Sequence, residues 1–458
     1  MIDSMTKPTG PRRRFALWQA AAAMSTLALV PLATGAMAKV DASTTEEFQR
    51  FMNVFLEVKS HYVEPVTDAK LIEGAINGML TSLDPHSGYL DARGFSNLRT
   101  QTDGEYGGLG LSVTQEDGVV KVIAPTAGTP ADRAGIKAGD YITHINKVLV
   151  FGMGLDEAVE QMRGRPGTEV AITVVREGQQ KPLELTLTRE IIDVKPVTWE
   201  LQGDVGVLRI ISFSANATRD LEAAMLAAEK SLGAKPRGWI LDLRSNPGGL
   251  LDEAVGVSDL FLERGEIVSQ RGRSKSDIER YFAQPGDISG GAPVIVLIDA
   301  GSASASEIVA GALQDHHRAV VMGQRSFGKG SVQTVLPLSE TTALRLTTAR
   351  YFTPSGRSVQ EGGIEPDLRV PQLSDPDYAS RPTFRESDLR RHLINEKKVD
   401  NGLLEKDSKP DPRFTETAEQ LKAKGIKDFQ LHYALQTIGR IKPQTPGTGA
   451  SRTSASKS

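Results

Sequence analysis

The sequence of 458 residues contains no cysteine, which excludes disulfide bonds, thiolate-bound metal, a cysteine nucleophile and a lipid-modified N-terminal cysteine. Its seven histidines include no H-x-x-x-H pair, and the neighbours His316 and His317 would point to different faces of a helix. An excess of one charge is also lacking, because 54 Lys and Arg oppose 57 Asp and Glu and leave a net charge of −3. We therefore expect no zinc site, and no electrostatic field that would attract nucleic acid or anionic lipid.

The apolar content is high enough for folded domains. Hydrophobic residues make up 39% of the chain and charged residues 24%, which is typical of a globular protein and not of a disordered one. At about 100–200 residues per domain, the length predicts two to four domains.

The N-terminus has the pattern of a secretory signal peptide. Three arginines at 12–14 precede a mostly apolar run at 15–30, and the small residues at 36–38 end in Ala38. We predict a signal peptide over 1–38 that is cleaved after Ala38, and export to the periplasm or cell envelope. An uncleaved anchor helix is the alternative, which the polar residues, Pro31 and Gly35 within or after the run disfavour. The arginines also have a weak similarity to a twin-arginine export signal.

Hydrophobic periodicity divides the middle of the chain. Helical spacing at 44–62 and 68–83 is followed over 106–189 by short alternating strands with two short helices. From residue 205 onward, strands alternate with helices; the run at 294–298 is continuously apolar, and that at 239–243 is apolar except for Asp242. This pattern predicts a largely parallel sheet that is covered on both faces. Ligands of such sheets bind at the carboxyl ends of the strands, so the loops after Leu243 and Ile298 are the places to search.

The C-terminal part has weaker patterns. A charged, proline-broken stretch covers about 375–412, and helical spacing follows at 414–423 and 429–441. The last residues, 443–458, are rich in Pro, Gly, Ser and Thr without an apolar period, which predicts a disordered tail.

Two loops follow the apolar strands. The loop D-L-R-S-N-P-G-G-L at 242–250 has two glycines whose amides suit an oxyanion, although a plain tight turn is the more ordinary explanation. In the second loop, Ser304 and Glu307 fit a helix capping box, and a serine at such a turn also suits a nucleophile. His316 and His317 lie 12 and 13 residues further on, about 18 Å along a helix, which excludes them as its base within that helix.

A third stretch, 323–331, nearly spells the phosphate-binding loop G-x-x-x-x-G-K-[ST]. Gly330 occupies the position that should carry the Mg²⁺-binding hydroxyl, and the residues at 332–338 read as a strand where that loop requires a helix. A phosphate-binding enzyme is therefore disfavoured. Lys329 is then either a solvated loop charge or a general base.

Together these motifs resemble the carboxy-terminal processing (tail-specific) protease family. The resemblance rests on G-S-A-S-A-S-E-I, on F-G-K-G-S-V-Q with its lysine 25 residues after the central serine, on the 242–250 loop and on L-D-P-H-S at 83–87. It extends from about Phe48 to Val370. The resemblance implies a Ser-Lys peptidase with an inserted PDZ domain, acting without metal or cofactor. It assigns Ser304 as nucleophile, Lys329 as general base, Gln333 as the residue that orients the lysine, and the amides of Gly249 and Ala305 as the oxyanion hole.

The inserted module fits this family. The stretch Y-G-G-L-G-L at 106–111 resembles the carboxylate-binding loop of PDZ domains, in which successive amides hold a peptide C-terminus. We therefore expect Leu109, Gly110 and Leu111 to bind substrate, with a glycine-rich hairpin as the alternative explanation.

The expected protein is an α/β multidomain enzyme with a mostly parallel-sheet protease core, an N-terminal helical region and an inserted PDZ domain. It would recognise unfolded or apolar protein C-termini and cleave as a serine endopeptidase through an acyl-enzyme. A non-catalytic PDZ adaptor is the alternative. The resemblance also implies self-association or a helical-repeat adaptor as partner. The expected division is a signal peptide (1–38), a helical region (39–100), a PDZ domain (101–190), a protease core (191–372), a partly helical region (373–442) and a tail (443–458).

Overall fold

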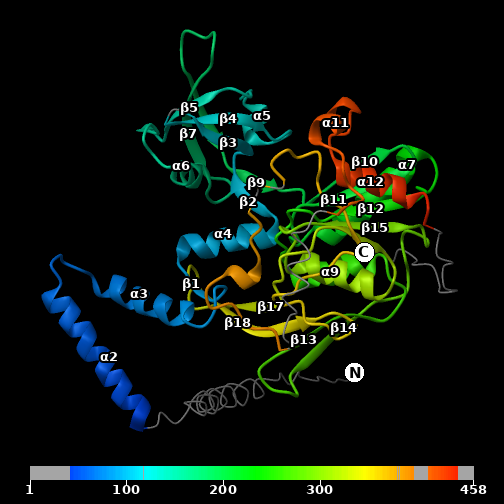
Figure 1. Ribbon diagram of the computed structural model, residues 1–458. Helices are drawn as coiled ribbons and strands as arrows, with labels where there is room; N and C mark the ends of the chain where they lie inside the picture. The colour runs from blue at the N-terminus through cyan, green and yellow to red at the C-terminus, as the bar shows by residue number, and fades with distance from the viewer. Residues whose placement is uncertain (1–41, 117, 379, 381, 397–410, 442–458) are drawn as a thin grey trace, which may run out of the picture. The chain divides into compact units, whose positions relative to one another are not determined.

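The computed structural model describes residues 42–116, 118–378, 380, 382–396 and 411–441 (Figure 1). The predicted signal peptide and the predicted tail therefore lie outside the described residues. The chain divides into two compact units, residues 1–75 and 76–458, which are treated separately below.

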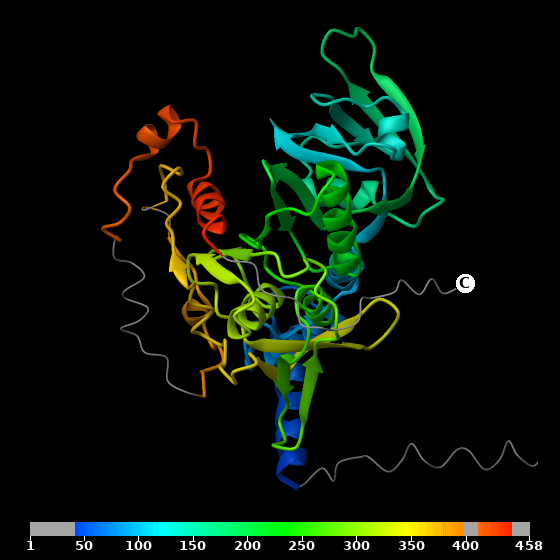
Figure 2. The ribbon, with the colours of Figure 1, turned by 90° about the vertical axis from the view of Figure 1, so that its right-hand side faces the viewer.

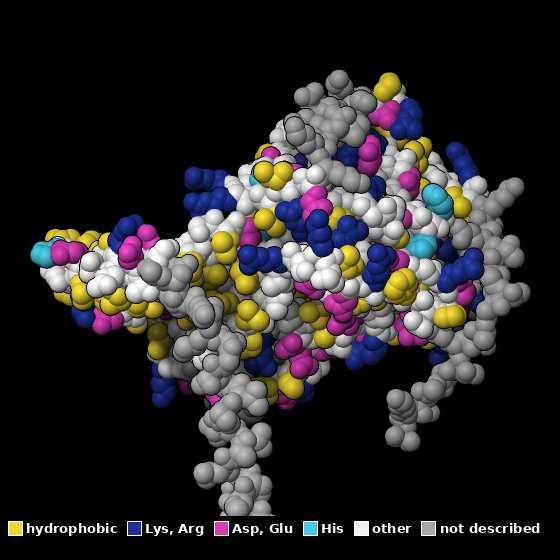
Figure 3. All heavy atoms as spheres, turned by 90° about the horizontal axis from the view of Figure 1, so that it is seen from below, with side chains coloured by type: hydrophobic (Ala, Val, Ile, Leu, Met, Phe, Trp, Pro, Cys, Tyr) yellow, Lys and Arg dark blue, Asp and Glu magenta, His cyan; other side chains and the backbone are white. Residues whose placement is uncertain are grey.

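The N-terminal unit is helical where it is described. It contains α2 (Ala42–His61) and the first part of α3 (Asp68–Thr81), as the apolar spacing predicts. Hydrophobic side chains remain exposed along α2, among them Phe48, Phe51 and Met52 (Figure 3). Within the described ranges, no helix combines the length and the apolar character needed to cross a membrane.

The second unit contains an antiparallel sheet that coincides with the predicted PDZ module. The burial of β7 alternates residue by residue, because successive side chains of a strand point to opposite faces. The inward side chains, such as Val120, Ile142 and Ile172, form a core that is separate from the rest of the unit. The sheet consists of β3 (Leu111–Glu116), β4 (Val119–Pro125), β5 (Tyr141–Ile145), β7 (Glu169–Val175) and β8 (Leu183–Thr188), with β6 (Val148–Leu149) beside β5 and the helices α5 (Pro130–Arg133) and α6 (Leu155–Met162).

A six-stranded sheet positions the loops of interest. Its order is β10 (Val197–Gln202), β11 (Val205–Ile210), β12 (Gly238–Asp242), β15 (Val294–Ile298), β16 (Val320–Gly323) and β19 (Leu368–Arg369). The β10–β11 pair is antiparallel and the other pairs are parallel. Strands β12 and β15 are buried throughout, which explains their continuous apolar sequences.

Helices cover both faces of this sheet (Figure 2). On one face, α7 (Ala217–Leu232), α8 (Leu251–Asp259) and α9 (Ala305–Asp315) pack against Leu241 and Val296. On the other face, α11 (Ala418–Ala423) and α12 (Phe429–Ile438) pack against Ile240 and Ile295. The segment after Val370, for which the motifs gave little guidance, thus completes the core.

A second sheet of the predicted protease core is entirely antiparallel. It consists of β1 (Gly88–Leu90), β18 (Ala343–Phe352), β13 (Glu266–Arg271), β14 (Ile278–Phe282) and β17 (Ser331–Pro337). An α/β multidomain architecture is therefore present, but a mostly parallel core is not confirmed, because among the strands that the structure describes only those of the six-stranded sheet form parallel pairs. The strand β17 follows Lys329 directly, where a phosphate-binding loop would need a helix.

Candidate active site

Ser304 lies at the turn from the buried strand β15 into α9. Its backbone angles, φ 57° and ψ −115°, are in a region that side chains with a Cβ rarely adopt. The preceding turn is fixed by Ser302, whose hydroxyl donates to the carbonyl of Leu243 at 2.8 Å. Strained backbone that is held by its surroundings is typical of functional positions.

The loop after β12 lies directly against Ser304. Gly248 has φ 101°, and a Cβ on it would be 2.8 Å from Ser304 Cβ and 2.9 Å from the Ala305 nitrogen, so only glycine allows this approach. Buried Asn246 holds the loop, because its side chain donates to the Ile210 carbonyl at 2.8 Å and accepts from the Gly248 amide at 2.9 Å.

The two predicted oxyanion donors are at this junction. Ala305 is the first residue of α9, and Gly249 is an exposed residue of the loop. Within the described part of the chain, neither of their amides donates to a protein acceptor. Two free amides beside a helix N-terminus are suited to bind a developing negative charge.

Glu307 connects the segments of the predicted serine and lysine. Its carboxylate is completely buried and accepts from the amides of Ser304 at 2.7 Å, Gly328 at 2.7 Å and Lys329 at 3.0 Å, and from the Ser326 hydroxyl. Burial raises the pKa of Glu307 to about 7, although these hydrogen bonds favour the carboxylate. The sequence suggested only a helix cap here. Its second role depends on a loop that begins 19 residues further along the chain.

Lys329 is half-buried, and this burial lowers the pKa of its amine. The nearby Arg345 lowers this pKa further, whereas the carboxylates of Glu386, Glu307 and Asp84 oppose the shift. Among the residues that the structure describes, no hydrogen bond joins the side chains of Ser304 and Lys329. The two segments are instead linked through Glu307.

Gln333 is expected to orient Lys329, but its side chain makes other contacts. Its side-chain amide donates to the hydroxyl of Ser331 at 3.0 Å and to that of Thr347 at 3.4 Å. No hydrogen bond from Gln333 to Lys329 occurs among the described residues. Gln333 nevertheless lies on β17, four residues after Lys329, where the pairing of β17 with β18 has a register irregularity.

The predicted peptide-binding loop lines a pocket of the PDZ module. Gly110 has φ 75°, and a Cβ on it would be 2.4 Å from the Thr129 side chain, so this turn requires glycine. The carbonyl of Gly110 accepts from the Thr126 amide at 2.8 Å, which fixes the loop. The pocket is lined by Tyr106, Gly108, Leu109, Gly110, Leu111, Val113, Val159, Met162 and Arg163.

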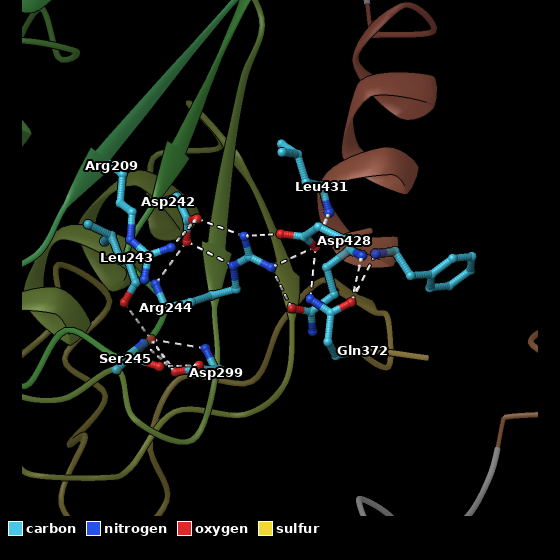
Figure 4. Close-up of polar contacts among 12 residues, drawn as sticks. Arg209, Asp242, Leu243, Arg244, Ser245, Asp299, Gln372, Asp428 and Leu431 are labelled. Carbon is cyan, nitrogen blue, oxygen red and sulfur yellow. Dashed lines mark hydrogen bonds and ion pairs between the residues drawn. The ribbon is translucent and has the colours of Figure 1, made fainter. Parts of the chain in front are cut away.

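A buried ion-pair network connects the loop after β12 with α12 (Figure 4). The Arg244 guanidinium donates to Asp242 at 2.8 and 2.7 Å and to Asp428 at 3.0 and 2.8 Å. Although burial disfavours the charge, these two carboxylates raise the pKa of Arg244. Asp428 is also the N-cap of α12 and accepts from the Leu431 amide at 3.0 Å. The C-terminal helix therefore fixes the loop that carries Gly248 and Gly249.

Replacing Asp428 by alanine should destabilise the core, because it leaves the Arg244 charge short of a partner and removes a helix cap. We expect a loss of about 3 kcal/mol, at the lower end of the range for broken buried pairs because Asp428 is partly exposed. Urea unfolding followed by the fluorescence of Trp239, which is buried in β12, measures it. Asp204→Ala breaks the exposed pair with Arg237 and should leave the midpoint unchanged. Equal midpoints for both variants would contradict this role of Asp428.

Three family models match successive parts of the chain. They are the activating protease CtpB N-terminal domain at residues 15–94, the PDZ domain at 107–187 and peptidase family S41 at 204–370. With the fold described above, they define the protein as a serine-type peptidase that carries a PDZ domain.

Curated relatives place it more narrowly. The chain is 47% identical over 401 residues to the carboxy-terminal-processing protease of Bartonella bacilliformis, covering 86% of this chain and 92% of that one. It is 35% identical over 351 residues to the carboxy-terminal processing protease CtpA of Bacillus subtilis, covering 74% and 72%. The chain belongs to the carboxy-terminal-processing proteases of peptidase family S41, which confirms the resemblance read from its motifs.

Among solved structures, the photosystem II D1 C-terminal processing protease is 30% identical, with a TM-score of 0.42, covering 72% of this chain and 89% of that one. The family models and the curated relatives establish the enzyme class and the PDZ domain, whereas the roles of the individual site residues stay predictions.

Proposed function

We propose that this protein is an exported endopeptidase that captures protein C-termini in its PDZ domain and cleaves them with Ser304 and Lys329. Membership in a peptidase family favours this function over a non-catalytic PDZ adaptor. Its site of action would be the periplasm or cell envelope, after removal of residues 1–38. The proposed division is a helical region (39–100), a PDZ domain (101–190), a protease core (191–372) and a partly helical region (373–442). Self-association or a helical-repeat partner stays a prediction.

One observation carries the catalytic part of the proposal. The buried Glu307 carboxylate binds the backbone of both Ser304 and Lys329, at 2.7 and 3.0 Å, while Gly248 packs against Ser304. Segments far apart in the sequence thus bring a serine, a desolvated lysine and free amides into one place. This is the set of groups that acyl transfer requires.

The proposed reaction proceeds through an acyl-enzyme. The neutral amine of Lys329 takes the proton of the Ser304 hydroxyl while the serine oxygen attacks the peptide carbonyl carbon. The carbonyl oxygen becomes an oxyanion and accepts hydrogen bonds from the amides of Gly249 and Ala305. When the intermediate collapses, the C–N bond breaks, and the lysine returns the proton to the leaving amine. A water molecule, deprotonated by the same amine, then hydrolyses the ester and restores both residues.

Two other residues have supporting roles in this proposal. Gln333, which begins four residues after Lys329, would orient the lysine amine once substrate is bound. Glu307 would hold the serine and lysine segments at a fixed separation, as catalysis by a positioned pair requires.

Substrate capture is tested with peptides that differ only at the C-terminus. Amides that converge on a carboxylate lose charge-assisted hydrogen bonds when the end is amidated, which costs about 1.5–3 kcal/mol, or roughly 10–100-fold in affinity. We therefore expect an apolar-ended peptide to bind full-length Ser304→Ala protein at least tenfold more tightly than its amidated twin. Fluorescence anisotropy measures both affinities without cleavage.

A second pair of peptides, free and amidated but with a charged last residue, serves as the control for apolar preference. If the amide form of the apolar peptide binds as tightly as the free acid, then Leu109, Gly110 and Leu111 do not form a carboxylate site.

A further inference from the structure

The segment at 382–396 lies beyond the end of the motif resemblance (Figure 1, orange). It folds onto residues 326–330, which carry Lys329 and are called the lysine loop below. The amide of Glu386, the first residue of the short helix η1 (Glu386–Asp388), donates to the carbonyl of Phe327 at 3.1 Å. Nearer the end of the segment, the Asn395 side chain donates to the Gln360 carbonyl at 2.6 Å, and the Asn395 amide donates to Glu361 at 2.7 Å. The lysine loop is therefore covered by residues that no recognised motif includes.

Glu386 is the buried centre of this contact. Its side chain has no exposed surface, and its oxygens lie 2.9 Å from His86 Nε2 and 3.0 Å from the Gln360 side-chain nitrogen. The oxygen of the same Gln360 amide accepts from the backbone amide of Gly330 at 3.0 Å. A carboxylate without access to water needs such partners. The Gln360 side chain thereby connects Glu386 to Gly330, the residue that follows Lys329.

The turn at 83–87 contacts β18, the strand that pairs with β17. The Arg345 Nε atom donates to the His86 carbonyl at 2.8 Å, and the Thr347 hydroxyl donates to Asp84 at 3.0 Å. The same Thr347 hydroxyl accepts from Gln333 at 3.4 Å. Hydrogen bonds thus run from Gly330 through Glu386 and the turn to Gln333, so that residues one and four positions after Lys329 belong to the same network.

Charged groups from four elements act on the Lys329 amine. Arg345 comes from β18, Glu386 from η1, Glu307 from α9 and Asp84 from the turn. Burial and then Arg345 lower the pKa of the lysine, and the three carboxylates raise it again. The balance between Arg345 and Glu386 therefore decides in part how much neutral amine is present.

We propose that Glu386 is a positioning residue of the lysine site, which anchors the loop through Gln360 and sets its negative charge against the positive charge of Arg345. This inference rests on the proposed role of Lys329 as general base. Its experiment uses a readout that does not depend on cleavage.

The proposal predicts opposite shifts for two variants that each remove one charge. Glu386→Gln keeps an oxygen for the Gln360 bond but removes a charge that favours the ammonium, so the Lys329 titration should move to lower pH. Arg345→Gln removes a charge that disfavours the ammonium, so the titration should move to higher pH. Each shift should be roughly 0.5–1 pH unit. Trace acetylation of the full-length Ser304→Ala protein at a series of pH values, read at Lys329 by mass spectrometry, measures the titration.

The matched control is Glu361→Gln. Glu361 is bonded to the same segment through the Asn395 amide at 2.7 Å and through His392 at 2.8 Å, but it is not among the charges that act on Lys329. A purely structural role for Glu386 predicts that Glu386→Gln and Glu361→Gln affect the Lys329 titration alike. Charge balance predicts that Glu386→Gln moves the titration and Glu361→Gln does not, and that Arg345→Lys restores what Arg345→Gln changes.

The same substitutions in the active enzyme connect the titration to catalysis. The pH at half-maximal kcat should move with the Lys329 titration in each variant, while KM changes little. Unmoved titrations in Glu386→Gln and Arg345→Gln would overturn this inference alone. Titrations that move without any change in the pH dependence of kcat would instead refute the assignment of Lys329 as base.

Discussion

Replacement of Ser304 by alanine is expected to abolish cleavage of a disordered protein, because the acyl-enzyme cannot form without the hydroxyl. The fold should persist. The loss of a helix cap costs about 0.5–2 kcal/mol, which corresponds to a change of a few degrees in the unfolding midpoint. Gel-based cleavage of an unstructured substrate, together with thermal unfolding of both proteins, measures the two effects separately.

The control for this variant is Ser231→Ala, a substitution of an exposed serine within α7. It should retain the activity and the midpoint of the parent protein. If Ser304 were only a cap, its alanine variant would keep most of its activity, and substantial residual proteolysis would therefore reject the assignment of the nucleophile.

Lys329→Arg is expected to be as inactive as Lys329→Ala, although it keeps the positive charge. A general base must be neutral, and an ordinary lysine with a pKa near 10.4 is less than ~0.1% unprotonated at pH 7. Burial lowers the pKa of Lys329 and so increases the neutral fraction, whereas arginine cannot lose its proton at accessible pH. Steady-state kinetics of the three proteins on a peptide substrate makes this comparison.

The pH dependence of the parent enzyme follows with a defined sign. Because burial lowers the pKa of the amine, activity should rise as the pH increases through that lowered pKa and then level off. Because burial also raises the pKa of Glu307 to about 7, the acetylation of Lys329 is needed to assign the rise to the lysine. An active Lys329→Arg enzyme would show that the base lies elsewhere.

The family and the enzyme class could be read from the sequence because their signals are local. The serine and lysine motifs each occupy fewer than ten consecutive residues at a turn, and their order and spacing need no knowledge of tertiary contacts. The strand after Lys329 is an equally local feature, since alternation of side chains predicts it directly. A strand at this position is incompatible with a phosphate-binding loop, and the structure confirms the strand as β17.

The prediction of a mostly parallel core failed to anticipate the second sheet for a different reason. Strands β13, β17 and β18 mix buried with intermediate or exposed residues, and β14 has no buried residue, so their sequences lack the apolar runs of β12 and β15. Their antiparallel pairing joins β13 to β18 and β1 to β18, across about 80 residues in one case and more than 250 in the other. Such pairing leaves no periodic signal in either partner.

By itself, the sequence determined the family, the serine and lysine motifs and the buried strands, because each depends on residues that are neighbours along the chain. Only the tertiary structure decided that Glu307 binds the amides of both Ser304 and Lys329, that Gly248 lies against Ser304, and that Glu386 reaches the lysine loop. A carboxylate in the sequence looks the same whether it caps a helix, pairs on the surface or faces a lysine. Its role is fixed by the burial and the partners that folding supplies, since these set the cost of its charge.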